Sequence, residues 1–146
     1  MADLRRLQIS KFFENSAPTT QQQCDQEAER ITGGAVCPTP VQGGASYTVL
    51  ANDGVVVVQF RLGRSPLDLD LLGHIKKTYG NFVPRPELTG KLGELYVYSM
   101  DNVGGVSMYL ARENLQQDNC RLLHRTVKDF ALSVDPIYLT RRKPYR

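Results

Sequence analysis

The amino-acid sequence predicts an α+β fold, with an antiparallel sheet of about five strands and helices packed on one side. Two observations carry this prediction. Two runs rich in β-branched and apolar residues, 43–51 and 55–61, flank the turn sequence Asn52-Asp53-Gly54, which is typical of a tight β-hairpin. Segments with helical spacing of apolar residues also precede and follow the extended segments along the chain.

The first two helices are predicted at residues 2–15 and 22–31. In the first, Leu4, Leu7 and Phe12 have spacings compatible with a short amphipathic helix, and in the second, Gly33-Gly34 supplies the stop signal. The prolines of segment 37–40 then favour an extended run that leads to the hairpin.

A third helix is predicted over 67–79, with Ser65 as its N-cap and Pro66 at its first position. Its apolar residues are expected on one buried side, and its acidic residues Asp68 and Asp70 in the first turn complement the helix dipole. The residues expected to be buried are Leu67, Leu71, Leu72 and Ile75.

The rest of the chain predicts a second hairpin and two helical pieces. The hairpin turn is placed at 90–93 and its return strand at 94–98, followed by a connector over 99–105. Helical pieces are expected at 106–111 and 119–134, where Pro136 ends the last one. The predicted organisation is one compact domain of three parts: helices and linker 1–41, sheet and helix 42–101, helices and basic tail 102–146.

Composition narrows the classes of partner. The 146 residues carry a net charge of +3, and much of the surplus lies in the tail 141–146, so no nucleic-acid partner is expected. No apolar run is long enough to span a bilayer and no cleavable leader is evident, so no membrane partner and a cytoplasmic location are expected.

The three cysteines are expected to be free thiols. Cys24, Cys37 and Cys120 cannot all pair within one chain and lack the spacing of metal ligands. No metal site is therefore predicted.

The glycine pair that opens the hairpin has two interpretations. Glycine lets the main chain approach an anionic ligand closely, so Gly43-Gly44 can lay backbone N–H groups over such a ligand. The same pair can simply permit a turn at the start of a strand. The pattern leaves both open.

Four strings in order carry a resemblance to a known family, and they lie at 42–49, 57–61, 78–84 and 97–100. Together they resemble the N-terminal lobe of fungal aminoglycoside phosphotransferase-like proteins, in the kinase-like superfamily that includes choline kinases. The resemblance covers roughly residues 24–129.

This resemblance implies a nucleotide half-site. Segment 43–46 would match the loop that covers the nucleotide, and segment 99–101 the hinge that meets the adenine. Gln59 or Arg61 would hold the phosphates, and Asp68 or Asp70 would orient that group. The implied ligand-binding residues are Gly43, Gly44, Ser46, Tyr47, Gln59, Arg61, Ser99 and Met100.

Phosphotransfer by this chain alone is not expected. The family keeps its metal-binding carboxylates and its acceptor-orienting aspartate on a C-terminal lobe, and the sequence ends before such a lobe could form. ATP with magnesium is therefore expected only if the chain is a truncated phosphotransferase; otherwise no cofactor is expected.

Three functions then compete. The chain can be a truncated phosphotransferase that binds nucleotide; a small-molecule-binding domain repurposed as a cofactor-free cyclase or isomerase; or an interaction module whose exposed apolar surface is covered by a partner or by homo-oligomerisation. The second hypothesis needs acid–base groups around a cavity. The candidates are Tyr47, Arg61, Glu94, Tyr98 and Asp101. Alternation places Glu94 and Tyr98 on one face of their strand, which can equally be an ordinary solvent-facing side.

Overall fold

The computed structural model describes residues 2–141 and forms two compact units, 1–103 and 104–146. Among the described residues, the first unit holds the five strands and three α-helices, and the second holds the last helix. The N-terminal helices belong to the same unit as the sheet. No helix in the described part of the chain is both long and apolar enough to cross a bilayer.

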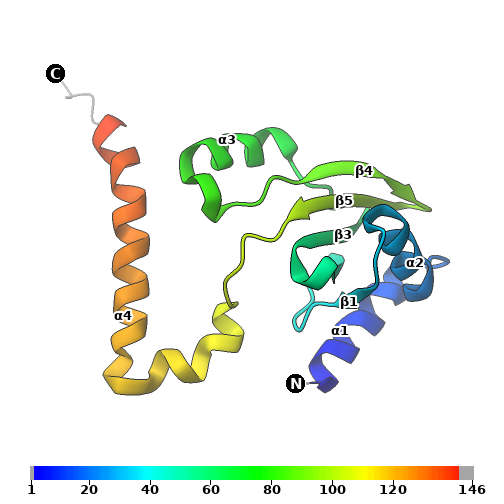
Figure 1. Ribbon diagram of the computed structural model, residues 1–146, viewed down its shortest axis with the longest axis horizontal. Helices are drawn as coiled ribbons and strands as arrows, with labels where there is room; N and C mark the ends of the chain where they lie inside the picture. The colour runs from blue at the N-terminus through cyan, green and yellow to red at the C-terminus, as the bar shows by residue number, and fades with distance from the viewer. Residues whose placement is uncertain (1, 142–146) are drawn as a thin grey trace. The chain divides into compact units, whose positions relative to one another are not determined.

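The first unit is built on a five-stranded antiparallel sheet with strand order β1-β2-β3-β5-β4 (Figure 1). The strands are β1 (Val36–Pro38), β2 (Ser46–Ala51), β3 (Val56–Leu62), β4 (Glu87–Leu92) and β5 (Leu95–Asp101). The predicted α+β fold class is therefore confirmed. The predicted first hairpin is also correct, because β2 and β3 join through Asn52–Gly54, where Asn52 and Asp53 have positive φ angles of 51° and 55°.

Two helices cover one face of the sheet, as predicted. Helix α1 spans Ala2–Asn15 and α2 spans Gln21–Thr32. Thr20 and Gln23 form a capping box at the start of α2, and Gly33 ends the helix with a φ of 73°. We name the sheet face beneath these helices the helix-covered face.

The hydrophobic core lies on this helix-covered face. Every second residue of β2 and β3 points into it, so that Tyr47, Val49, Val58 and Phe60 are all fully buried. Phe12 of α1 contributes an aromatic ring whose centroid lies 6.3 Å from that of Tyr47. The period-two pattern of the hairpin is thus explained by one buried face.

The third helix begins later than predicted. Helix α3 spans Leu69–Tyr79, and its N-cap is Asp68, whose carboxylate accepts a hydrogen bond of 2.9 Å from the Leu71 N–H. The predicted cap, Ser65, is engaged elsewhere, because its hydroxyl accepts a hydrogen bond from Arg61. Arg61 of the preceding strand β3 thus engages the Ser65 side chain that the sequence pattern assigns to the helix N-cap.

The predicted buried side of this helix is also wrong. None of the residues of α3 is buried, and Leu71 is 54% exposed. Leu67, Leu72 and Ile75 are only partly covered. Amphipathic spacing predicted the helix correctly but not how far its apolar side is covered.

The turn of the second hairpin lies later than predicted. Strand β4 continues through Lys91 to Leu92, and the turn is formed by Gly93 and Glu94. Gly93 has the positive φ, 57°, that the turn requires, whereas Gly90 sits at a shift in the strand register. The sequence pattern placed Gly90 and Gly93 in one turn, but only Gly93 forms the turn and Gly90 lies within the strand.

The predicted connector begins three residues too early, because Ser99, Met100 and Asp101 complete β5. In the second unit, helix α4 spans Met108–Arg141 and is interrupted by non-helical angles from Gln117 to Cys120. Two helical pieces were predicted, but the first begins two residues later than predicted and continues past Ala111. The helix continues past Pro136, contrary to the prediction. Most of the predicted basic tail, residues 142–146, lies outside the described residues.

Candidate functional site

The sheet face opposite α1 and α2 carries a row of polar side chains joined by hydrogen bonds. Gln59 donates to the Thr48 hydroxyl at 3.2 Å, and its carbonyl oxygen accepts from Arg61 Nη1 at 3.1 Å. Arg61 reaches onward to Ser65. We name Thr48, Gln59, Arg61 and Ser65 the Arg61 row.

Arg61 is held firmly but keeps an unbalanced charge. Its Nε donates to the Ser65 carbonyl oxygen at 2.7 Å and its Nη2 to the Ser65 hydroxyl at 3.1 Å, so three of its five N–H groups are engaged by neutral oxygens. Among the described residues, no carboxylate forms an ion pair with it. Asp68 and Asp70, the carboxylates expected to orient the cation, do not reach it.

Tyr98 lies beside the Arg61 row because it is the cross-strand partner of Gln59. Its side chain is 2% exposed, and its hydroxyl accepts a hydrogen bond from the Leu67 N–H at 3.2 Å. This contact attaches the loop before α3 to the sheet. Tyr98 therefore has a clear structural task.

The predicted glycine loop is a tight turn next to the same row. Gly43 forms an isolated bridge with Ser46, and Ser46 is the cross-strand partner of Arg61. Neither Gly43 nor Gly44 has a positive φ. A side chain at Gly43 would meet the Ser46 hydroxyl oxygen at 2.8 Å, whereas nothing lies near Gly44. Because the Ser46 hydroxyl ends a short side chain that can rotate away, this contact does not by itself require glycine at position 43.

Tyr47, a predicted ligand-binding residue, lies on the helix-covered face, away from Gln59 and Arg61. Its hydroxyl donates to Asp25 at 2.7 Å and accepts from the Gln21 side chain at 3.0 Å. Burial, helped by the neighbouring Asp25, raises the pKa of Tyr47 far above its usual range. The tyrosine joins α2 to the core.

Burial also changes the pKa values of two residues near Tyr47. It raises the pKa of Asp25 despite the hydrogen bonds from Tyr47 and Gln21, which act in the opposite direction. Burial and the nearby Asp25 raise the pKa of Cys24 to about 12. The Cys24 thiol is consequently protonated at neutral pH and unreactive as a nucleophile.

The five predicted acid–base groups do not converge, and Tyr47 already lies on the helix-covered face. Glu94 precedes β5 and Asp101 ends it, so six strand steps, about 20 Å, separate their ends of the strand. The Asp101 carboxylate accepts a hydrogen bond of 3.2 Å from the Arg85 N–H, which lowers its pKa. Only Arg61 and Tyr98 lie near one another, on adjacent strands. Ser99 and Met100 pair with Val58 and Val57 toward the Asp101 end.

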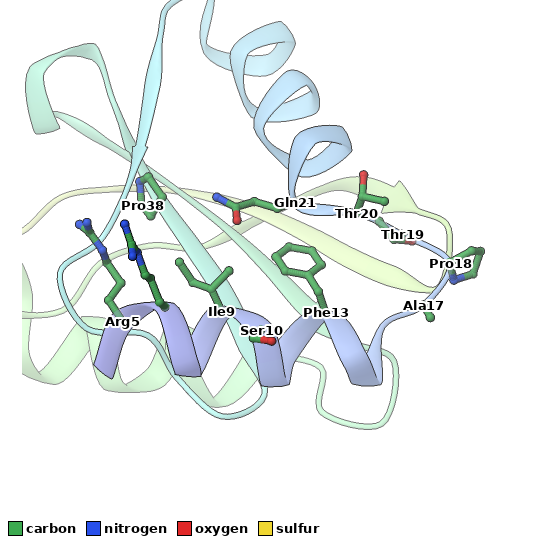
Figure 2. Close-up of a pocket in the computed structure, with 11 residues that line it drawn as sticks. Arg5, Ile9, Ser10, Phe13, Ala17, Pro18, Thr19, Thr20, Gln21 and Pro38 are labelled. Carbon is green, nitrogen blue, oxygen red and sulfur yellow. The ribbon is translucent and has the colours of Figure 1, made fainter. Parts of the chain in front are cut away.

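A separate pocket of about 660 Å³ lies where α1 meets the start of α2 and strand β1 (Figure 2). Its α1 wall follows a helical stripe, with Arg5, Ile9 and Phe13 four residues apart and Arg6 and Ser10 beside them. Sequence reasoning missed this site, although the stripe is visible in the sequence as Arg5, Ile9 and Phe13 at four-residue spacing. The part of the chain that the structure describes holds no cluster of histidine, cysteine and acidic residues suited to a metal.

Comparisons with protein-family models, with curated proteins and with solved structures give no match for this chain.

Proposed function

We propose that residues 1–103 form a small-molecule-binding domain without phosphotransfer chemistry of its own, and that its ligand carries an anionic group bound by Arg61. The observation that carries the proposal is the unbalanced charge of Arg61. A partly buried cation is costly unless an anion or a set of dipoles offsets it. Here neutral oxygens of Gln59 and Ser65 fix the guanidinium, and two N–H groups stay available.

The arrangement suits a planar or tetrahedral oxyanion. Two N–H groups of one guanidinium can bind a carboxylate or a phosphate at two oxygens, which gives both strength and orientation. The row also orients the guanidinium before any ligand arrives, because Gln59 is itself held by Thr48. Preorganisation of this kind lowers the cost of ordering the site on binding.

A nucleotide is the more specific candidate for the ligand. The turn 43–46 leads into Ser46, which pairs directly with Arg61, so a phosphate on Arg61 would lie beside this turn. This placement favours the nucleotide-binding alternative that the resemblance to phosphotransferase N-terminal lobes implies. We do not extend the proposal to cyclase or isomerase chemistry, because Glu94 and Asp101 lie at opposite ends of β5.

The test is thermal unfolding of the chain with Mg-ATP, with sodium triphosphate and without ligand. A ligand present at 100 times its dissociation constant stabilises the folded chain by about 2.7 kcal/mol, which is readily visible for a domain of this size. Arg61→Gln should abolish the shift, and Arg61→Lys should leave a weaker one because a lysine cannot bind at two oxygens.

The matched control is Arg64→Gln, which removes the same charge from an exposed loop position three residues away. It should leave the ligand-induced shift unchanged. A shift with triphosphate alone assigns the site to a general oxyanion, whereas a larger shift with Mg-ATP assigns it to a nucleotide. If neither ligand shifts the midpoint, or if Arg61→Gln binds as well as the parent, the proposal is wrong.

A further inference from the structure

We infer that the pocket between α1, segment 17–21 and β1 binds an amphipathic organic anion, a carboxylate with an apolar body. This inference is independent of the ligand proposed for Arg61, because the pocket lies on the other side of the sheet and shares no residue with the Arg61 row. Its volume of about 660 Å³ is within the range of small-molecule sites.

The apolar part of the ligand has a defined surface. Ile9 and Phe13 project from α1 toward the space below Gln21, and Pro38 closes the side formed by β1 (Figure 2). Phe13 is fixed by its neighbours, since its ring centroid lies 5.0 Å from that of Phe12 and 5.1 Å from that of Tyr47. The floor of the pocket is thus continuous with the hydrophobic core.

The carboxylate of the ligand can pair with two arginine side chains. Arg5 and Arg6 are adjacent in sequence and both line the pocket, and neither forms an ion pair with a carboxylate in the part of the chain that the structure describes. Because both side chains line the same pocket, an anion bound there can accept charge-assisted hydrogen bonds from guanidinium groups and offset their positive charge.

Gln21 supplies one polar contact in the wall of the pocket. Its amide nitrogen donates to the Tyr47 hydroxyl, because that hydroxyl gives its own proton to Asp25. The Gln21 carbonyl oxygen then points toward α1 without a protein donor among the described residues (Figure 2). A ligand that carries a hydroxyl or N–H group near its apolar body would satisfy this oxygen.

The experiment is an NMR titration of the isotopically labelled chain with octanoate, and with octan-1-ol as the uncharged control. Octanoate should shift the signals of Ile9, Phe13 and the Gln21 side-chain amide in a saturable manner, and the alcohol should bind at least about tenfold more weakly. The double variant Arg5→Gln/Arg6→Gln should lose about tenfold in octanoate affinity and little in alcohol affinity.

The matched control is Lys11→Gln, which removes a positive charge from an exposed position of the same helix outside the pocket. It should bind octanoate as the parent does. Equal affinity for acid and alcohol, unchanged affinity in the double arginine variant, or the absence of saturable shifts at the pocket would each overturn the inference. Because the Arg61 row is untouched by these variants, binding of triphosphate reports on the proposed function separately.

Discussion

The two faces of the sheet use the same strands for opposite purposes. On the helix-covered face, Tyr47, Val58 and Phe60 are fully buried beneath α1 and α2. On the other face, the alternate residues Thr48, Gln59 and Arg61 form a hydrogen-bonded row that is only partly buried. The contrast teaches that the hairpin's stability comes from one face, so that the other is free to carry polar groups that a ligand can use.

Replacing one valine on each face measures this difference most strongly. Val58 is fully buried on the helix-covered face, whereas its neighbour Val57 is only partly buried on the opposite face. Val58→Ala should lower the free energy of unfolding by about 2–3 kcal/mol, because it removes two buried methyl groups and leaves a cavity. Val57→Ala, measured by the same urea denaturation, should cost less than about 1 kcal/mol. Equal losses would mean that both faces contribute similarly to the free energy of unfolding.

Two tyrosines, one on each face of the sheet, allow the stabilising effects of single hydroxyl groups to be compared. Tyr47→Phe removes a donor to the partly buried Asp25 carboxylate, so it should cost about 2 kcal/mol, as expected for a hydrogen bond to a charged group. Tyr98→Phe removes only an acceptor for the Leu67 N–H and should cost about 1 kcal/mol. Chemical denaturation of both variants at pH 7 checks the order, and a larger loss for Tyr98→Phe would contradict it.

The smallest effect concerns Asp25 and depends on pH. Because burial raises its pKa, the folded chain holds the Asp25 proton more tightly than the unfolded chain, and stability falls as pH rises from the unfolded to the folded pKa. Asp25→Asn removes the charge and keeps an oxygen for Tyr47. The variant should therefore be slightly more stable than the parent at pH 7, by less than about 1 kcal/mol given its partial exposure.

The same comparison of Asp25→Asn and parent at acidic pH is the internal control. Below the ordinary pKa of an aspartate, both chains carry a neutral group at this position and their stabilities should converge. Thermal unfolding from pH 3 to 8 follows the difference. A parent that is more stable than Asp25→Asn at pH 7, with the difference disappearing on acidification, would mean that the charged carboxylate stabilises the fold.

Much of the fold could be predicted from local patterns. The turn Asn52-Asp53-Gly54 and the stop at Gly33 carry their conformation in their own residue types, so the first hairpin and α2 lie where the sequence predicts. The errors arise where a residue has two possible partners. Ser65 serves Arg61 instead of the helix, and Gly93 takes the turn that Gly90 also could have formed.

The site was less predictable, because it depends on which strand faces and ends meet. Alternation correctly placed Gln59 and Arg61 together, but it could not show that Tyr47 lies beneath helices or that Glu94 and Asp101 are far apart. The pocket with Arg5 and Arg6 needs the packing angle of α1, which no local pattern contains. The resemblance to phosphotransferase N-terminal lobes stays a prediction.

The two outer strands have a consequence for the behaviour of the chain at high concentration. Strand β1 is only three residues long and ends at Pro38, which offers no N–H group, while β4 is interrupted at Gly90 and carries Lys91. Short, irregular or charged edges are poor templates for strand pairing between molecules. The sheet is thereby protected from edge-to-edge aggregation at both of its open sides.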